Sequence, residues 1–133
     1  MKIYLTVVIV ICAVYYGYGR YVGGKDYLQT TLEYTKKHPD PKWSPMIDYY
    51  VGFTYYQQGE YTKAKGAFQQ QLADYPTAQY APEGLVKLCL TAQELREWGT
   101  AKEAAARYIE EYPDGKDIKL MKSNLDSLNY NHP

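Results

Sequence analysis

The sequence predicts an all-α fold: a short array of antiparallel helix pairs, preceded by an N-terminal hydrophobic helix and closed by a C-terminal capping helix. The main observation is a self-similarity at a spacing of 37 residues. The aligned pairs are Val51 and Leu88, Tyr61 and Trp98, Ala64 and Ala101, Leu72 and Ile109, Tyr75 and Tyr112, and Pro76 and Pro113. A helical pattern with a period in the thirties is typical of repeat arrays, in which each pair buries its apolar face against its neighbours.

The length and the charge of the chain restrict the number of domains and the classes of partner. The chain has 133 residues, enough for one domain with a usable core. Its 15 basic residues balance its 15 acidic residues, so no net field favours nucleic acid or an anionic surface. The two cysteines lie far apart in unlike surroundings, and we expect no disulfide between them.

The N-terminal segment, residues 1–24, is predicted to be a hydrophobic anchor. No charged residue lies between Ile3 and Gly19, a length at the short end of what spans a bilayer as a helix. Aromatic rings and a basic side chain that favour the membrane–water interface gather at its far end: Tyr15, Tyr16, Tyr18, Arg20 and Tyr21. Residues 3–22 are therefore expected to contact the lipid bilayer as a transmembrane helix. A cleaved signal peptide and a buried core helix are the alternatives.

Residues 25–133 are predicted to form the repeat domain. The first repeat spans about 45–76, where Gly59 would be the turn between two helices and Ala64 their point of contact. The second spans about 82–113. There Thr100-x-x-Glu103 resembles a capping box that would start a helix at Ala101, whereas the repeat register starts it near Trp98. The register draws on more residues and is preferred.

Each end of the domain carries a further helical pattern. Residues 25–38 read as the second half of a degenerate earlier repeat. At the other end, about 117–129, one face is apolar, with Ile118, Met121, Leu125 and Leu128. Lys119, Lys122, Asn124 and Asp126 lie off that stripe. This arrangement suits a helix that caps an array against solvent.

The first repeat resembles the tetratricopeptide repeat family in its order of small, aromatic, glycine, alanine, aromatic and proline positions. The second copy keeps Leu88, Ala101 and Pro113 but carries Ala92 for the aromatic residue and Arg96 for the glycine. The resemblance implies that these residues pack the repeats: Gly52, Tyr55, Gly59, Tyr61, Ala64, Phe68, Pro76, Leu88, Cys89, Trp98, Ala101, Ile109 and Pro113. The loop YPTAQYAPEG resembles those of bacterial envelope members, which implies a cell-envelope protein with a periplasmic or extracytoplasmic repeat domain.

The inventory of reactive groups does not favour an enzyme. His38 lies in a turn and His132 is the penultimate residue, and neither belongs to a metal-spaced pair. Cys89 falls at a small packing position. The sequence therefore predicts no catalytic residue, no metal site and no cofactor.

The resemblance also implies a binding face. In the family, the first helix of each repeat lines the concave side of the array. Carried over to this sequence, that face would present Met46, Tyr49, Phe53, Tyr56, Val86, Leu90 and Gln93. Large aromatic side chains are good anchors at protein interfaces. The alternative is that these residues pack on the helix predicted at 25–38.

These features predict a non-enzymatic scaffold, most simply a membrane-anchored accessory or assembly subunit of an envelope complex, with other proteins of that complex as partners. Two alternatives remain open. One is a protomer that self-assembles into a filament or tube. The other is a soluble periplasmic peptide-binding module released by signal cleavage.

Overall fold

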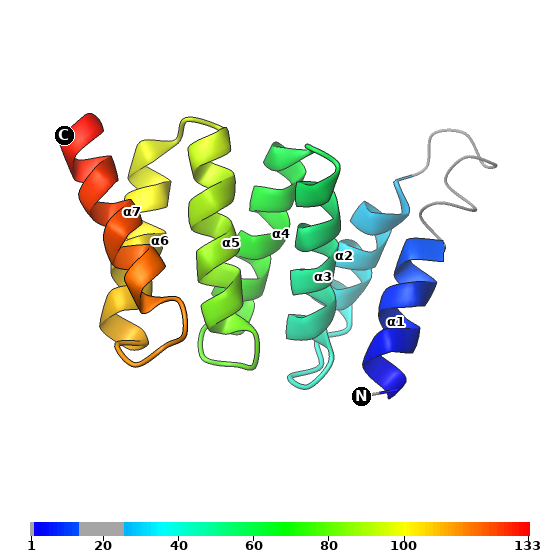
Figure 1. Cartoon of the computed structure of the whole chain (residues 1–133). Helices are drawn as coiled ribbons and strands as arrows, with labels where there is room; N and C mark the ends of the chain where they lie inside the picture. The colour runs from blue at the N-terminus through cyan, green and yellow to red at the C-terminus, as the bar shows by residue number, and fades with distance from the viewer. Residues whose placement is uncertain (1, 14–25) are drawn as a thin grey trace. The chain divides into compact units, whose positions relative to one another are not determined.

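The computed structural model describes residues 2–13 and 26–133, and within them all regular secondary structure is helical (Figure 1). The chain divides into two compact units, residues 1–39 and Asp40–Pro133. The first unit holds α1 (Lys2–Ala13) and α2 (Tyr27–Lys37). Helix α2 begins at an N-cap, where the Asp26 carboxylate accepts a hydrogen bond from the Gln29 backbone amide at 3.2 Å.

The predicted transmembrane helix is not supported. The described part of helix α1 is apolar and has 12 residues. In the two described stretches, no helix combines the length and the apolar character needed to cross a bilayer. The predicted interface residues Tyr15, Tyr16, Tyr18, Arg20 and Tyr21 lie outside the described residues.

The second unit consists of five helices: α3 (Ser44–Gln57), α4 (Tyr61–Asp74), α5 (Ala81–Glu94), α6 (Trp98–Glu111) and α7 (Ile118–Asn131). Each has 14 residues. Shifting α3 by 37 residues gives the bounds of α5 and then of α7, and the same shift converts α4 into α6. The all-α repeat prediction is confirmed, and α6 begins at Trp98, as the register required, and not at the capping box.

Consecutive helices of this unit pack against one another, and α3 also contacts α5. The result is two layers, with α3, α5 and α7 in one and α4 and α6 in the other (Figure 1). Each pair thus shares its apolar faces with the next pair, as expected for a repeat array.

The turn inside each pair needs a residue in the left-handed region. Gly59 adopts φ 77° between α3 and α4, and Arg96 adopts φ 57° at the equivalent place between α5 and α6. In each turn a backbone amide reaches back to a helix carbonyl, from Glu60 to Tyr55 at 2.9 Å and from Glu97 to Ala92 at 2.8 Å. These bonds satisfy carbonyls that the helix end would leave unpaired.

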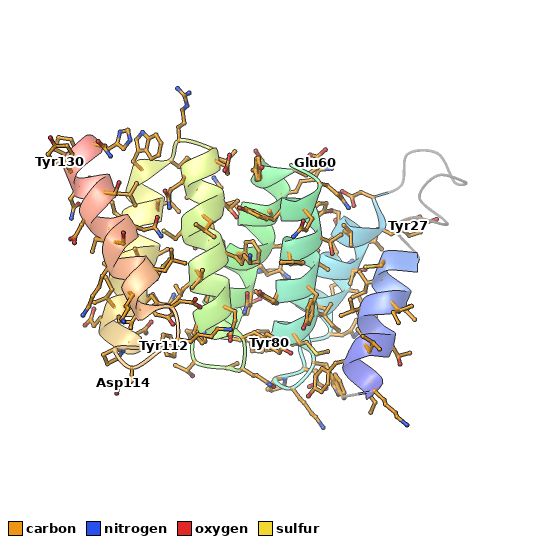
Figure 2. All side chains as sticks on the ribbon, viewed as in Figure 1. Tyr27, Glu60, Tyr80, Tyr112, Asp114 and Tyr130 are labelled. Carbon is orange, nitrogen blue, oxygen red and sulfur yellow. The ribbon has the colours of Figure 1, made fainter. Side chains whose placement is uncertain are left out.

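Buried side chains fasten the loops between pairs. After α4, the fully buried Gln71 donates from Nε2 to the Tyr80 carbonyl at 2.8 Å. After α6, the equivalent residue is Tyr108, whose hydroxyl accepts from the Asp117 amide at 3.0 Å. Figure 2 shows Tyr80 and Tyr112 in the two loops at the same end of the helices, opposite Glu60. The same position in each repeat therefore fixes the entry of the next helix.

The core is built from small residues beside large ones. Ala64 and Ala101 are fully buried at the helix contacts. A Cβ added at Gly52 would lie 2.6 Å from the Phe68 ring, so α3 and α4 approach closely there. The remaining predicted packing residues divide by exposure. Tyr55, Leu88 and Cys89 are buried, Tyr61, Trp98 and Ile109 are half-buried, and Gly59, Pro76 and Pro113 are exposed.

Helix α7 has one buried and one polar side. Met121 and Leu128 are buried, Ile118 and Leu125 are half-buried, and Lys119, Lys122 and Asp126 are exposed. Asp126 occupies the position that Gly52 has in α3 and Cys89 in α5, where both are buried against the following helix. A charged residue there suits a helix that faces water.

Candidate docking face

An aromatic row runs across the adjacent helices α3 and α5. We use this name for Tyr49, Tyr50, Phe53, Tyr56 and Tyr80. The Tyr49 and Tyr80 rings stack at 5.3 Å between centroids, and Tyr50 meets Tyr80 edge-on at 5.6 Å. Phe53 continues the row at 6.4 Å from Tyr49. Tyr49, Phe53 and Tyr56 share one side of α3 because they are three, four and seven residues apart, and Tyr50 joins them through its contact with Tyr80.

A lysine from α5 completes the row. The Lys87 ammonium lies 5.0 Å from the centroid of Phe53 and 5.3 Å from that of Tyr56. Both distances fall within the range of a cation–π interaction. Tyr56 also meets Tyr61 of α4 edge-on at 5.5 Å. Lys87 thus lies over two rings of the row at once.

Members of the row differ in accessibility. Tyr49 is only 9% exposed and also contacts Phe68 at 6.0 Å, so it ties the row to the core. Burial, with a smaller contribution from Glu83, raises the pKa of Tyr49 to about 12. Tyr50, Phe53, Tyr56 and Tyr80 are half-buried and keep part of each ring available. Burial, followed by the charge of Glu94, raises the pKa of Tyr56 as well.

Tyr80 is held in an unusual backbone conformation. Its φ of 73° lies in the left-handed region, which costs about 1–2 kcal/mol for a residue other than glycine. The hydrogen bond from Gln71 to its carbonyl and the stack on Tyr49 hold it there. Gly84 makes room for Gln71, since a Cβ at that glycine would lie 2.5 Å from the Gln71 amide oxygen. Retained strain of this kind is concentrated at functional surfaces.

The structure places the predicted binding residues unequally. Phe53, Tyr56, Leu90 and Gln93 are half-buried. Gln93 donates to Asn124 of α7 at 3.4 Å, which links α5 to the last helix. Met46, Tyr49 and Val86 are 3%, 9% and 7% exposed and offer little surface of their own.

The predicted binding residues did not include Tyr50, Tyr80 or Lys87. Tyr50 lies beside Tyr49 in a helix, where neighbouring residues are not expected to share a face. Tyr80 belongs to a loop, and its backbone conformation leaves no sequence signal in a tyrosine. Lys87 could have been found from its position three residues before Leu90, which belongs to the predicted face.

Groups suited to catalysis or metal binding are not gathered here. The His38 ring packs on Tyr34 at 4.7 Å, and the His132 ring stacks on Trp98 at 3.7 Å. Cys89 is fully buried, and that burial raises its pKa, which disfavours the reactive thiolate. Within residues 2–13 and 26–133 no cluster of His, Cys, Asp or Glu has the composition and proximity to hold a metal ion.

Five helices in a 37-residue register, with an aromatic face across the first and third of them, define a helical-repeat protein. Comparison with known families makes this more specific. The chain belongs to the YfiO family of outer membrane lipoproteins, whose family model matches residues 41–122, more than half of the sequence. A comparison with curated proteins finds no match. The family match supports a location in the cell envelope. Members of this family are generally non-catalytic.

Proposed function

We propose that this chain is an accessory or assembly subunit of a cell-envelope complex and that the α3–α5 face docks a protein partner. The aromatic row bridged by Lys87 is the observation that supports this proposal most strongly. Half-buried aromatic rings supply large contact areas with little loss of side-chain freedom, which is why such residues dominate interface hot spots.

The family match supports the same location and class of role. It covers α3 to α6 and the start of α7, so the aromatic row lies wholly inside the matched region. An outer membrane lipoprotein family places its members in the envelope. Protein partners in that compartment are therefore the natural candidates.

Replacing exposed parts of the face should weaken the partner complex without unfolding the array. Tyr56→Ser combined with Leu90→Ser removes two half-buried apolar groups, one from each helix. Hot-spot truncations typically cost 1 kcal/mol or more, so we expect the amount of co-purified envelope protein to fall by about ten-fold. Quantitative affinity purification from native envelopes measures the amount of partner protein that co-purifies with each variant.

The matched control is Lys63→Ser with Gln69→Ser, two exposed positions on α4. This pair should leave co-purification unchanged, and both double variants should retain the helical circular dichroism of the parent. Equal co-purification by all three proteins would contradict a docking role for the α3–α5 face.

A further inference from the structure

Lys87 is a half-buried cation that forms no ion pair among the described residues. Its ammonium lies over Phe53 and Tyr56. The other α5 charge on this face, Glu83, lies 4.0 Å from Lys116 instead. A half-buried ammonium flanked by rings has lost part of its hydration and still has donors to offer. The complementary group is a carboxylate supplied from outside.

The other end of the row presents a flat aromatic surface. Tyr80 and Tyr50 are both half-buried and meet edge-on, with Tyr49 stacked behind Tyr80. The hydrogen bond from Gln71 holds Tyr80 in its strained conformation, so the ring is oriented before any ligand arrives. Adjoining tyrosine rings of this kind are the usual contact for proline rings in extended ligands.

The spacing of the two features selects one ligand conformation. Tyr80 is the N-cap residue directly before α5, and Lys87 lies six residues after Ala81, the first residue of the helix, about 9 Å along it at ~1.5 Å per residue. A polyproline II segment advances ~3.1 Å per residue and returns to the same side every third residue, after about 9.3 Å. A β-strand presents groups on one side only every second residue, at about 6.6 or 13 Å, and neither distance matches this spacing.

We propose that the α3–α5 face binds a polyproline II segment of an envelope protein in which a proline and a carboxylate are three residues apart. The proline packs on Tyr80 and Tyr50, and the carboxylate pairs with Lys87. Glu83 lies on the helical turn between them and disfavours further acidic residues at the two intervening positions. This inference rests on the proposed docking function and names the chemistry of its partner.

Three fluorescent nonapeptides test the proposal by anisotropy with the full chain purified in detergent: PPPPEPPPP, PPPPQPPPP and GSGSEGSGS. The first carries prolines three residues before and three residues after the glutamate, so it serves either chain direction. We expect it to bind about five-fold more tightly than the glutamine peptide, which corresponds to a partly exposed ion pair. We also expect it to bind more tightly than the glycine–serine peptide, which lacks the preformed helix.

Two variants separate the two contacts. Lys87→Gln should abolish the preference for glutamate over glutamine while leaving the glutamine peptide bound as before. Tyr80→Asn keeps a residue that tolerates positive φ, removes the ring, and should weaken both proline peptides. Lys63→Gln is the matched control. Lys63 lies on α4, and its ammonium is 5.7 Å from the centroid of the Tyr55 ring, which is not part of the aromatic row. This substitution should change nothing.

Equal binding of the glutamate and glutamine peptides, a preference that survives Lys87→Gln, or no binding of any peptide would each overturn the proposal. If no peptide binds while Tyr56→Ser with Leu90→Ser still reduces co-purification, the docking face stands and the ligand class is wrong. If both experiments fail, the docking function fails with it.

Discussion

Gly52 and Phe68 show how a single position sets the distance between two helices. The Phe68 ring fills the space that a Cβ on Gly52 would need, at 2.6 Å. In the second repeat the equivalent positions are Cys89 and Ala105, both fully buried. The larger residue of the pair therefore lies on the first helix in the second repeat and on the second helix in the first repeat. Such exchanges explain why the second repeat departs from the pattern of the first and keeps the same helices.

We expect Gly52→Ala to lower the free energy of unfolding by about 1–3 kcal/mol, the usual cost of overpacking a core. The cost should shrink in a Phe68→Leu background, because the smaller side chain removes the ring atoms that the new methyl group meets. Urea denaturation of the four proteins of this cycle gives the coupling energy.

Gly66→Ala is the matched control for that substitution. Gly66 lies in α4, and no other group lies within 4 Å of an added Cβ. Alanine there should stabilise the helix, by up to about 1 kcal/mol. If Gly52→Ala were as harmless as Gly66→Ala, or equally costly in both Phe68 backgrounds, the close packing of α3 on α4 would not have its assigned role.

Single residues also mark where prediction from sequence ended. Gly59 and Ala64 were identifiable because the turn and the helix contact repeat at a fixed spacing. Tyr80 was not, because its strained backbone depends on a hydrogen bond from Gln71, nine residues away on another helix. Contacts made across helices, such as Lys87 over Phe53, need the three-dimensional arrangement.

At the scale of elements, the helix bounds follow the repeat register more faithfully than the local capping signals. The capping box at Thr100 and Glu103 does not start α6, because the turn at Arg96 and its bond from Glu97 to Ala92 fix the start three residues earlier than Ala101, at Trp98. Tertiary packing thus overrides a local preference.

The turn between α5 and α6 offers an element-scale prediction. Arg96 is exposed and adopts φ 57°, a conformation that glycine adopts without strain, as Gly59 does in the preceding repeat. Arg96→Gly should therefore raise the free energy of unfolding by about 1 kcal/mol. Thermal denaturation followed by circular dichroism measures the change.

The reciprocal substitution, Gly59→Arg, should destabilise the array by a similar amount, since open space surrounds that glycine and only backbone strain opposes a side chain. A loss of stability in Arg96→Gly would show that the arginine side chain contributes more than its backbone strain costs.

At the scale of the whole molecule, the family match and the aromatic row fall in the same unit. The match covers 41–122, and the unit spans Asp40–Pro133. The repeat period and the balance of charge could be taken from the sequence. They were sufficient to predict the helical-repeat fold. The accessible part of the surface could not be predicted in this way. Periodicity assigns residues to a face of a helix but does not reveal which of them remain exposed, as the burial of Met46 and Val86 shows.

The central claim is that the α3–α5 face touches a protein partner in the envelope, and site-specific photo-cross-linking in native envelopes tests it most directly. A photoreactive phenylalanine at Tyr56, which is half-buried on that face, should give a discrete adduct larger than the chain. The same group at Gln69, exposed on α4, should give none. Equal adducts at both positions, none at Tyr56, or an adduct only to a second copy of the chain would contradict the account.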